Sequence, residues 1–175
     1  MPTIENSTLA DIPVIYSFYE MGIALQKARS DRHWQHFERE LLEREIAEGR
    51  QWKLLIDGTV AAVFLTADCD REIWGPRDND DAIYLHRIVT HPDFRGQRIF
   101  RQIMEWAKTY AADRQRPYLR MDTWGDNDRL VGYYMEHGFT LLEVVTPEET
   151  GALPAHYDCI SLALLEMPVK QDSGR

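Results

Sequence analysis

A strand, a tight turn and a helix follow one another around His91, and this succession constrains the fold more than any other part of the sequence. The stretch runs from Tyr84 to Phe139, and its centre is the segment from His91 to Arg114. The segment Ala82 to Thr90 has the β-branched and aromatic content of a strand, and a Pro-Asp-Phe-Arg-Gly turn follows it. Apolar side chains then recur with a helical period at Ile99, Ile103, Met104, Ala107, Tyr110 and Ala111. A strand that leads through a glycine turn into an amphipathic helix predicts an α/β fold.

Three arginines crowd the start of this helix, namely Arg95, Arg98 and Arg101. The macrodipole is positive there and unpaired backbone N–H groups point outward, so an arginine is unfavourably placed by about 0.3 kcal/mol unless an anion binds. A glycine-containing strand-to-helix turn with exposed amides and flanking arginines has the outline of a phosphate or pyrophosphate cradle. Three solvated surface arginines are the alternative, and the turn alone does not separate the two interpretations.

The overall charge excludes some classes of partner. The chain has 175 residues, 44% hydrophobic, and a formal charge of -9 from 20 Lys and Arg against 29 Asp and Glu. This length and composition predict one well-buried domain. The net negative charge argues against nucleic acid or an anionic membrane as the main partner. The window from His86 to Arg101 departs from the balance, because it holds four arginines and one acid, Asp93. A polyanionic ligand at one site fits this distribution better than a polyanionic surface partner.

Cysteine usage and hydropathy limit the cellular compartments in which this chain is expected. Cys69 and Cys159 are the only cysteines, and they are far apart and not in a C-x-x-C motif. Neither a disulfide framework nor a zinc site is therefore indicated, and we expect no metal and a cytoplasmic protein. The sequence shows neither a leader with a basic and then an apolar region nor a run of about eighteen apolar residues, so we expect neither export nor a membrane span.

The rest of the chain predicts the element order β-α-α-β-β-β-α-β-α-β-β, which is an α/β domain with a mixed sheet. The further elements are an edge strand at 2–6, a helix from about residue 12 to Ala28, a helix capped by Asp31 and ended by Gly49, hairpin strands at 51–56 and 59–67 around Asp57-Gly58, a strand at 117–123, a helix capped within 126–128 and ended by Gly138, and strands at 139–145 and 157–165. Trp34, Phe37, Leu41 and Ile46 should share one face of the second helix. We expect one domain over residues 1–168 and a disordered tail over 169–175.

The segment from Asp68 to Asp81 is the most acidic loop of the chain, with Ile73 and Trp74 as its apolar residues. Its polar, turn-rich composition predicts an exposed loop with one aromatic anchor. Such a loop is either simply solvated or a rim that attracts a cationic substrate.

The combined motifs resemble those of the GNAT superfamily of acyl-CoA-dependent N-acetyltransferases. A strand is followed by the V-T-H-P-D-F-R-G turn, a helix, a strand, an Asn-led helix that ends in Y-Y-M-E-H-G-F, and another strand. The local motifs cover Tyr84 to Phe139, and the element order matches over nearly the whole chain. The resemblance implies a single-domain α/β fold with a mixed, mostly antiparallel sheet flanked by about four helices. It also implies acetyl-CoA (coenzyme A) as the co-substrate.

In that superfamily the turn typically reads Arg-Gly-x-Gly-x-Gly/Ala, and its amides bind the pyrophosphate of coenzyme A at the helix start. The resemblance therefore implies cofactor contacts at Arg95, Gly96, Gln97, Arg98, Ile99, Phe100 and Arg101. Arg95 and Gly96 match the pattern, whereas Arg98 and Phe100 stand where glycine and a small residue are usual. Peptide N–H donors survive any replacement other than proline, and the Arg98 guanidinium can itself reach a phosphate.

Further roles are implied position by position. Ile88 and Val89, at the end of the strand before the turn, match the place where backbone groups hold the pantetheine arm and an N–H polarises the thioester carbonyl. Asn127 matches an asparagine that contacts the cofactor arm. Tyr134 matches both a cofactor contact and the tyrosine that often protonates the departing thiolate. Tyr133, its neighbour, we interpret as a core aromatic.

Direct attack on the thioester needs a neutral amine, so a base or solvent must take a proton at pH 7. His86 is the one histidine on the central strand, and Asp81 lies just before that strand, so either could serve through water. Each is alternatively a structural residue. The predicted reaction transfers an acetyl group from acetyl-CoA to a primary amine of a small, cationic molecule, without an acyl-enzyme. A homodimer is compatible with the sequence. A non-catalytic acyl-CoA-binding sensor or interaction module on the same fold is the alternative function, and a nucleic-acid-binding role is disfavoured by the charge.

Overall fold

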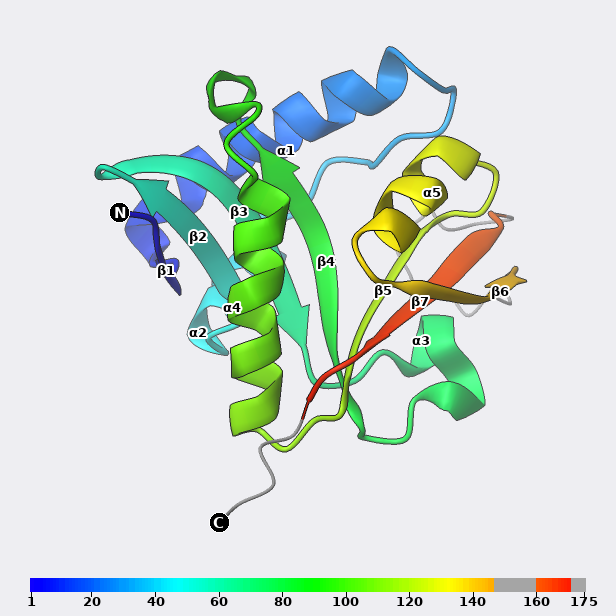
Figure 1. The fold of residues 1–175 in the computed structure, drawn as a ribbon. Coiled ribbons are helices and arrows are strands. Elements are labelled where there is room, and N and C mark those ends of the chain that lie inside the picture. Colours follow the sequence, from blue (N-terminus) through cyan, green and yellow to red (C-terminus); the bar gives the residue numbers. More distant parts are fainter. Residues whose placement is uncertain (147–159, 171–175) are drawn as a thin grey trace. The chain divides into compact units, whose positions relative to one another are not determined.

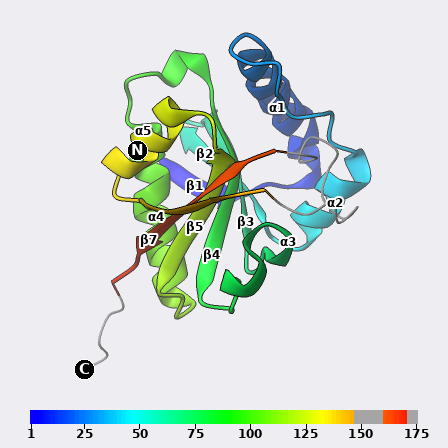
Figure 2. The same ribbon diagram turned by 90° about the vertical axis from the view of Figure 1, so that its right-hand side faces the viewer.

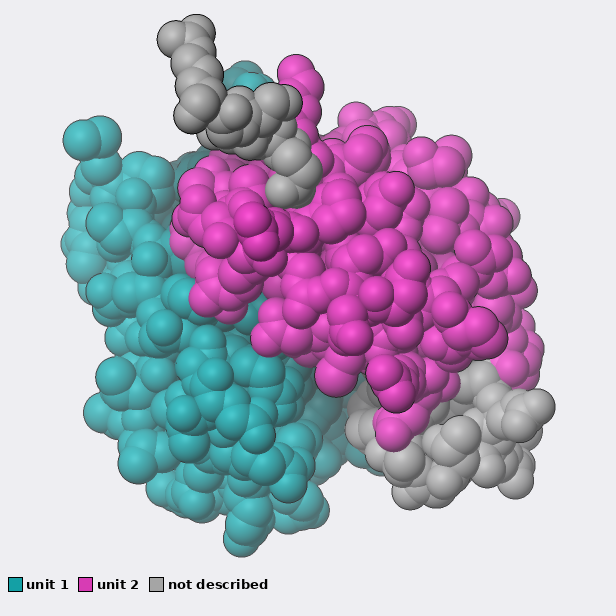
Figure 3. All heavy atoms as spheres, turned by 90° about the horizontal axis from the view of Figure 1, so that it is seen from below, with its two compact units in different colours: residues 1–66, 86–104 teal, residues 67–85, 105–175 magenta. Residues whose placement is uncertain are grey.

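The computed structural model describes residues 1–146 and 160–170. These residues form two compact units, one of residues 1–66 and 86–104 and one of residues 67–85 and 105–175 (Figure 3). Strand β4 and helix α4 pass from one unit to the other. The helices and strands are β1 (Thr3–Asn6), α1 (Ile12–Lys27), α2 (Arg39–Ala47), β2 (Gln51–Ile56), β3 (Thr59–Ala67), α3 (Arg71–Trp74), β4 (Ala82–Thr90), α4 (Ile99–Asp113), β5 (Tyr118–Trp124), α5 (Asp128–Glu136), β6 (Thr140–Val145) and β7 (Leu162–Pro168), with short 3-10 turns at Leu9–Asp11, Gly75–Arg77 and Pro92–Phe94 (Figure 1).

The strands follow the order β1-β2-β3-β4-β5-β7-β6 in a seven-stranded sheet. Every pairing with a determined register is antiparallel except that of β4 with β5, which is parallel. The mixed, mostly antiparallel sheet that the sequence predicts is thereby confirmed. The long connection through α4 is what lets β4 and β5 run in the same direction, because parallel neighbours need a crossover.

The first unit holds the hairpin of β2 and β3 and the helices α1 and α2. Asp57 and Gly58 at the hairpin tip have φ values of 50° and 81°, the left-handed pair that a two-residue turn requires. Antiparallel pairing joins β1 to β2 and β2 to β3. The core of this unit is built by one face of α1 and by apolar residues of the neighbouring elements; it consists of Ile12, Ile15, Phe18, Tyr19, Phe37, Leu42, Val63 and Val89.

The second helix is shorter than the sequence predicts. It begins at Arg39, whereas the periodic pattern placed its start after Asp31. The Trp34 N–H donates to the Gln26 side-chain oxygen at 2.7 Å, and the Tyr16 hydroxyl donates to the Phe37 carbonyl at 3.0 Å. Side chains of α1 thus satisfy backbone groups that a helix would have paired internally. The aromatic residues bury themselves from an irregular segment, and their spacing imitated a helix.

The second unit holds β5, β7 and β6, with α5 between β5 and β6 along the chain. Strand β7 pairs with β5 and with β6, both antiparallel, and Figure 2 shows it beside β5. The sequence placed the last strand at 157–165. Residues 157–159 lie outside the described residues, and β7 begins at Leu162 and ends at Pro168. Val169, placed in the predicted tail, is buried, and its N–H donates to the Pro117 carbonyl at 2.7 Å. Residues 171–175 lie outside the described residues.

The acidic segment from Asp68 to Asp81 is more ordered than an exposed loop. It contains the four-residue helix α3 and a 3-10 turn, and Ile73 and Trp74 are buried. Asp78 is buried too, and it accepts a hydrogen bond from the Tyr84 hydroxyl at 2.8 Å. The prediction of an exposed loop was wrong, because it was made from polar, turn-rich composition, and composition does not show that Asp78 has a buried partner in Tyr84. Among the described residues, no helix is both long and apolar enough to cross a membrane.

Candidate active site

The turn from β4 to α4 places backbone amides and arginines at one helix start. A 3-10 turn at Pro92–Phe94 follows β4, and the Gln97 N–H closes onto the Phe94 carbonyl at 3.2 Å. Gly96 has a φ of 81°, and a Cβ added there would meet nothing within 4 Å. The Arg98 carbonyl accepts the N–H of Gln102 at 3.1 Å, so Arg98 is the residue that precedes the first turn of α4 and accepts its first hydrogen bond. The first N–H groups of any helix have no carbonyl partner within the helix, which makes a helix start a common site for an anion.

The conformation of Arg98 explains why glycine is usual at its position in the turn. Its φ is 56°, in the left-handed region, where a residue with a Cβ is disfavoured by about 1–2 kcal/mol. Arg95, Gly96 and Arg98 are exposed, so their charges and amides face solvent. The residue is therefore held in the turn geometry in spite of its side chain, and the guanidinium stays accessible to a ligand.

Phe100 does not obstruct the turn. Its side chain is buried, as is that of Ile99, so both point into the protein. The large residue at a usually small position is accommodated by the core, not by the surface that a ligand would approach. The helix stripe predicted from the sequence is buried at Ile99, Ile103, Met104, Ala107 and Ala111, and Tyr110 is half-buried.

The end of β4 carries a second left-handed residue, Arg87, with a φ of 51°. Within a strand, such a residue marks a local irregularity that re-aims the backbone that follows. Ile88 and Val89 are the next two residues, half-buried and buried respectively. The backbone of β4 beyond Leu85 is thus distorted immediately before the two residues to which the family resemblance assigns the thioester contact.

His86 lies on β4 just before that distortion. Burial, together with the positive charges of Arg87 and Arg50, lowers the pKa of its imidazole to about 3. The imidazole is neutral at pH 7 and has little affinity for a proton. This environment disfavours His86 as the group that deprotonates an ammonium ion.

Helix α5, in the second unit, presents the predicted asparagine and tyrosine. Asn127 is the N-cap of α5, and its side-chain oxygen accepts the Leu130 N–H at 3.1 Å. Tyr134 is half-buried. Burial raises the pKa of the Tyr134 phenol, and Tyr133 and Asp122 raise it further, so the hydroxyl stays protonated at neutral pH. Tyr133 is 40% exposed and lies against the His137 ring, with the ring centroids 4.3 Å apart, so our interpretation of it as a core aromatic is wrong.

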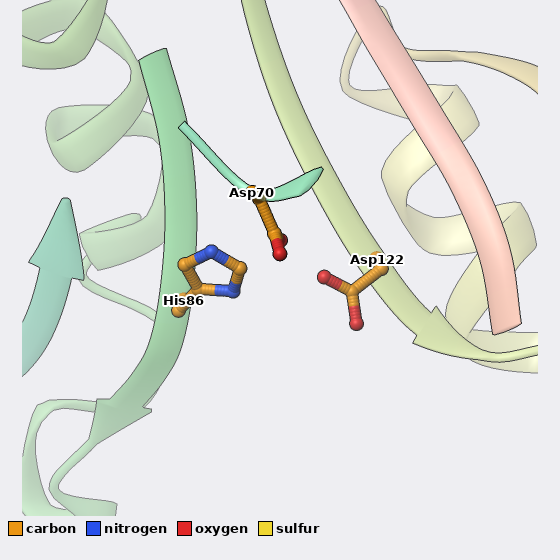
Figure 4. A group of neighbouring side chains, drawn as sticks. All are labelled: Asp70, His86 and Asp122. Atoms are coloured by element: carbon orange, nitrogen blue, oxygen red, sulfur yellow. The ribbon is translucent and has the colours of Figure 1, made fainter. Parts of the chain in front are cut away.

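Two carboxyl groups of the second unit lie close together, and no pattern in the sequence indicates this pair. Asp70 comes from the segment after β3 and Asp122 from β5; Figure 4 shows their carboxyl groups turned toward one another. Each offers an oxygen within 4.8 Å of the other. Burial raises the pKa of both, and the nearby charge of Asp122 adds to the rise at Asp70. Two partly buried carboxyl groups at this separation tend to share a proton near neutral pH.

Asp81 belongs to a separate group of polar side chains in the second unit, around Arg120. Its Oδ1 lies 2.9 Å from Nη1 of Arg120, a buried arginine that also pairs with Glu166 at 2.8 Å. The same guanidinium donates to the Tyr84 hydroxyl at 3.0 Å. These partners suit a structural role for Asp81, because they hold its carboxylate against a buried guanidinium.

Comparison with known proteins decides the family. A sequence model of the acetyltransferase (GNAT) family matches residues 18–139, which is more than half of the chain. The chain belongs to the GNAT family. The uncharacterized N-acetyltransferase YesJ of Bacillus subtilis (strain 168) is 26% identical over 158 residues, which cover 79% of this chain and 88% of that protein.

Solved structures share the fold of this GNAT protein. A GNAT-family acetyltransferase from Listeria monocytogenes 4b F2365 superposes with a TM-score of 0.75 at 18% identity, covering 95% of this chain and 94% of that one. The structure of yncA from Salmonella typhimurium with its cofactor acetyl-CoA gives a TM-score of 0.67 at 13% identity, with coverage of 100% and 98%. The predicted family and fold are confirmed, and the protein is an acetyl-CoA-dependent acyltransferase of the GNAT type.

The turn of this GNAT protein fits an acyl-CoA pyrophosphate on its own geometry. Its glycine leaves open space, its helix start offers N–H donors, and its arginines are exposed. The residues assigned by the sequence to the cofactor and to catalysis stay predictions. Asp70 and Asp122 join them from the structure, because only the fold brings residues 52 positions apart into one pair.

Proposed function

We propose that this GNAT protein transfers the acetyl group of acetyl-CoA directly to a primary amine of a small, cationic molecule, with Asp122 as the base. The observation that carries the proposal is the pair of half-buried carboxyl groups of Asp70 and Asp122. An ammonium group that reaches the pair relieves the repulsion between two like charges, so a cationic acceptor is favoured.

The raised pKa of the pair supports the role of a base. A carboxylate with an ordinary pKa near 4 accepts a proton from an ammonium ion poorly, whereas a base matched to the working pH accepts it well. Asp122 has a raised pKa. Its charge also raises the pKa of the Tyr134 phenol, so the proposed base and the proposed acid interact electrostatically. His86 and Asp81, the candidates from the sequence, have a low proton affinity and a fixed ion pair respectively.

The reaction balances with one base and one acid. Asp122 takes a proton from the acceptor ammonium, and the neutral nitrogen attacks the thioester carbonyl to form the N–C bond. The carbonyl oxygen is stabilised by a backbone N–H at Ile88 or Val89. The C–S bond then breaks, and the thiolate receives the Tyr134 phenol proton. The proton that the nitrogen loses on becoming an amide returns to the tyrosine through water, and Asp122 releases its own proton to solvent.

The remaining residues of the proposed site bind the cofactor. Arg95, Arg98 and Arg101 offer charge-assisted contacts to the phosphates, and the amides of Gly96 and Gln97 lie in the same turn. Asn127 retains its side-chain N–H₂ for the cofactor arm, since its oxygen caps α5. The half-buried position of the carboxyl pair favours a slender amine as acceptor.

An acetyl-transfer assay with an amine panel tests the proposal. Release of free thiol from acetyl-CoA is followed with polyamines, amino sugars, neutral amines and a peptide with a free N-terminus. We expect the highest kcat/KM with a small cationic amine, and a fall in that value as salt is raised. Turnover confined to the peptide, or equal turnover of neutral and cationic amines, would overturn the acceptor class. Binding of acetyl-CoA without turnover of any amine would favour the acyl-CoA sensor instead.

A further inference from the structure

One carboxylate of helix α2 is buried, although it lies among charged residues of the sequence. Glu45 of α2 is only 2% exposed. Its Oε1 forms an ion pair with Nη2 of Arg87, and its Oε2 accepts from the Gln51 side-chain amide at 2.8 Å. The same amide donates to the Tyr19 hydroxyl at 2.9 Å. Arg87 of β4 and Gln51 of β2 therefore hold the Glu45 carboxylate, and Tyr19 of α1 in turn accepts from Gln51, all within the first unit.

The partner of this carboxylate is the left-handed residue of β4. Arg87 has a φ of 51°, a conformation that a residue with a Cβ adopts only when its surroundings impose it. Its guanidinium carbon lies 4.8 Å from the centroid of the Phe37 ring and 5.3 Å from that of Tyr19. The side chain is thus fixed by an ion pair and two rings, and its side-chain exposure is 11%. The backbone distortion and the fixed side chain belong to the same residue.

We infer that Glu45 is a positioning residue, which holds Arg87 in its left-handed conformation and so aims the backbone N–H groups of Ile88 and Val89. The inference rests on the proposed role of those two residues toward the thioester carbonyl. Donors that stabilise a developing oxyanion must be placed to within a fraction of an ångström, and a small misplacement costs rate. Ile88 and Val89 directly follow Arg87, so any relaxation of its φ reorients their peptide planes.

A contribution to stability alone is a weaker account of the pair. A buried ion pair adds little net stability, because desolvation of both charges offsets their attraction. A buried pair is better suited to holding the backbone of Arg87 in the left-handed conformation rather than an extended one. The pair also explains why arginine, and not glycine, can occupy a left-handed position in the strand.

The test separates the backbone role from simple packing. Glu45→Gln keeps the shape of the side chain and removes its charge. The double variants Glu45→Gln/Arg87→Gly and Glu45→Gln/Arg87→Ala both remove the ion pair, but only glycine adopts a positive φ without a steric cost. Glu43→Gln, on the same helix and in an exposed ion pair with Arg39, is the matched control. The carbonyl stretch of bound acetyl-CoA labelled with ¹³C at the carbonyl reports polarisation without any acceptor.

In the wild type and in Glu43→Gln, we expect the stretch to move to lower wavenumber on binding. Glu45→Gln should lose most of this shift and about 10- to 100-fold in kcat, with the Kd of coenzyme A within about threefold of the wild type. The glycine double variant should regain the shift and at least about tenfold in kcat over the alanine double variant. Equal values in the two double variants, or an unchanged shift in Glu45→Gln, would overturn the inference.

Thermal unfolding and the carbonyl shift of the wild type are two controls. Thermal unfolding of each variant shows whether it is folded at the assay temperature, and a folded Glu45→Gln with wild-type kcat would also overturn the positioning role. No carbonyl shift in the wild type with acetyl-CoA bound would overturn the proposed role of Ile88 and Val89, and this inference with it. A wild-type shift that persists in Glu45→Gln overturns the positioning role alone.

Discussion

The turn between β4 and α4 and the carboxyl pair of Asp70 and Asp122 obtain their chemistry in opposite ways. The turn is a continuous segment, exposed and basic, and its donors are backbone amides aimed by two left-handed residues, Gly96 and Arg98. The pair is discontinuous, half-buried and acidic, and its chemistry comes from side chains whose pKa values the surroundings raise. One region suits a polyanion, and the other suits an ammonium group.

The difference teaches how tolerant each region is to substitution. Backbone donors survive most replacements, so the turn keeps its function with Arg98 and Phe100 at positions that are usually small. A titrating side chain has no such substitute. We therefore expect a single substitution to reduce activity more at the carboxyl pair than at the turn.

The largest effect is expected for Asp122→Asn. Asparagine keeps the shape of the side chain but cannot accept the acceptor proton, so kcat/KM should fall by about 10² to 10⁴. In the wild type, kcat/KM should rise with pH as the pair loses its shared proton, because the raised pKa places that loss near neutral pH. The variant should lack this limb of the pH profile.

Asp113→Asn, an exposed residue at the end of α4, serves as the control and should retain the wild-type profile. A pH profile of Asp122→Asn that matches the wild type would remove Asp122 as the base. Asp70→Asn sharpens the assignment, since a partner that only tunes the pKa of Asp122 should shift the limb to lower pH without abolishing it.

Tyr134→Phe is expected to have the next largest effect. The change removes only the hydroxyl, so acetyl-CoA affinity should survive while kcat falls by about 10², the lower end of the usual range for a general acid. The lower end is expected because burial raises the pKa of this phenol and makes it a weaker acid. Tyr133→Phe, at an exposed neighbour, should leave kcat unchanged. A larger loss in Tyr133→Phe would transfer the role to that residue.

Arg98 should matter less, and mainly for binding. Arg98→Ala removes a charge-assisted phosphate contact, typically about 1.5 to 3 kcal/mol, so calorimetry should show the Kd of coenzyme A raised roughly 10- to 150-fold. Arg98→Gly loses the same contact but also relieves the left-handed conformation, so this variant should unfold at a higher temperature than Arg98→Ala. Tighter binding of coenzyme A by Arg98→Gly would mean that the arginine obstructs the turn.

The sequence predicts well what is local in the chain. The hairpin at Asp57-Gly58, the strand β4, the stripe of α4 and the cap at Asn127 each depend on neighbouring residues, and the structure confirms them. The start of α2 was misplaced because aromatic residues that bury themselves from an irregular segment have the same spacing as a helix face.

What the sequence could not predict depends on long-range neighbours. Asp122 lies in a strand that also holds Arg120 and Thr123, and nothing in this local pattern shows that Asp70 lies against it. Glu45 lies among charged residues of an amphipathic helix, and its burial becomes evident only when Arg87 lies beside it. A titratable group takes its properties from residues that the fold brings near, so its role follows from the structure.

The smallest effect that still separates the two regions is on stability. The raised pKa of Asp122 means that the folded protein binds a proton more tightly than the unfolded chain, in which the carboxyl group has its ordinary pKa near 4. Between that value and neutral pH the folded state holds more protons, so its free energy of unfolding should fall as pH rises. Asp122→Asn should remove this dependence and be more stable than the wild type at pH 8, on the order of 1 to 2 kcal/mol, with little advantage at pH 4.

Urea unfolding at a series of pH values measures these free energies, with Asp113→Asn as the reference that keeps the wild-type slope. A free energy of unfolding of the wild type that rises from pH 5 to 8, with Asp122→Asn following it in parallel, would show that the carboxyl pair is already ionised and would leave Asp122 without the raised proton affinity that a base needs.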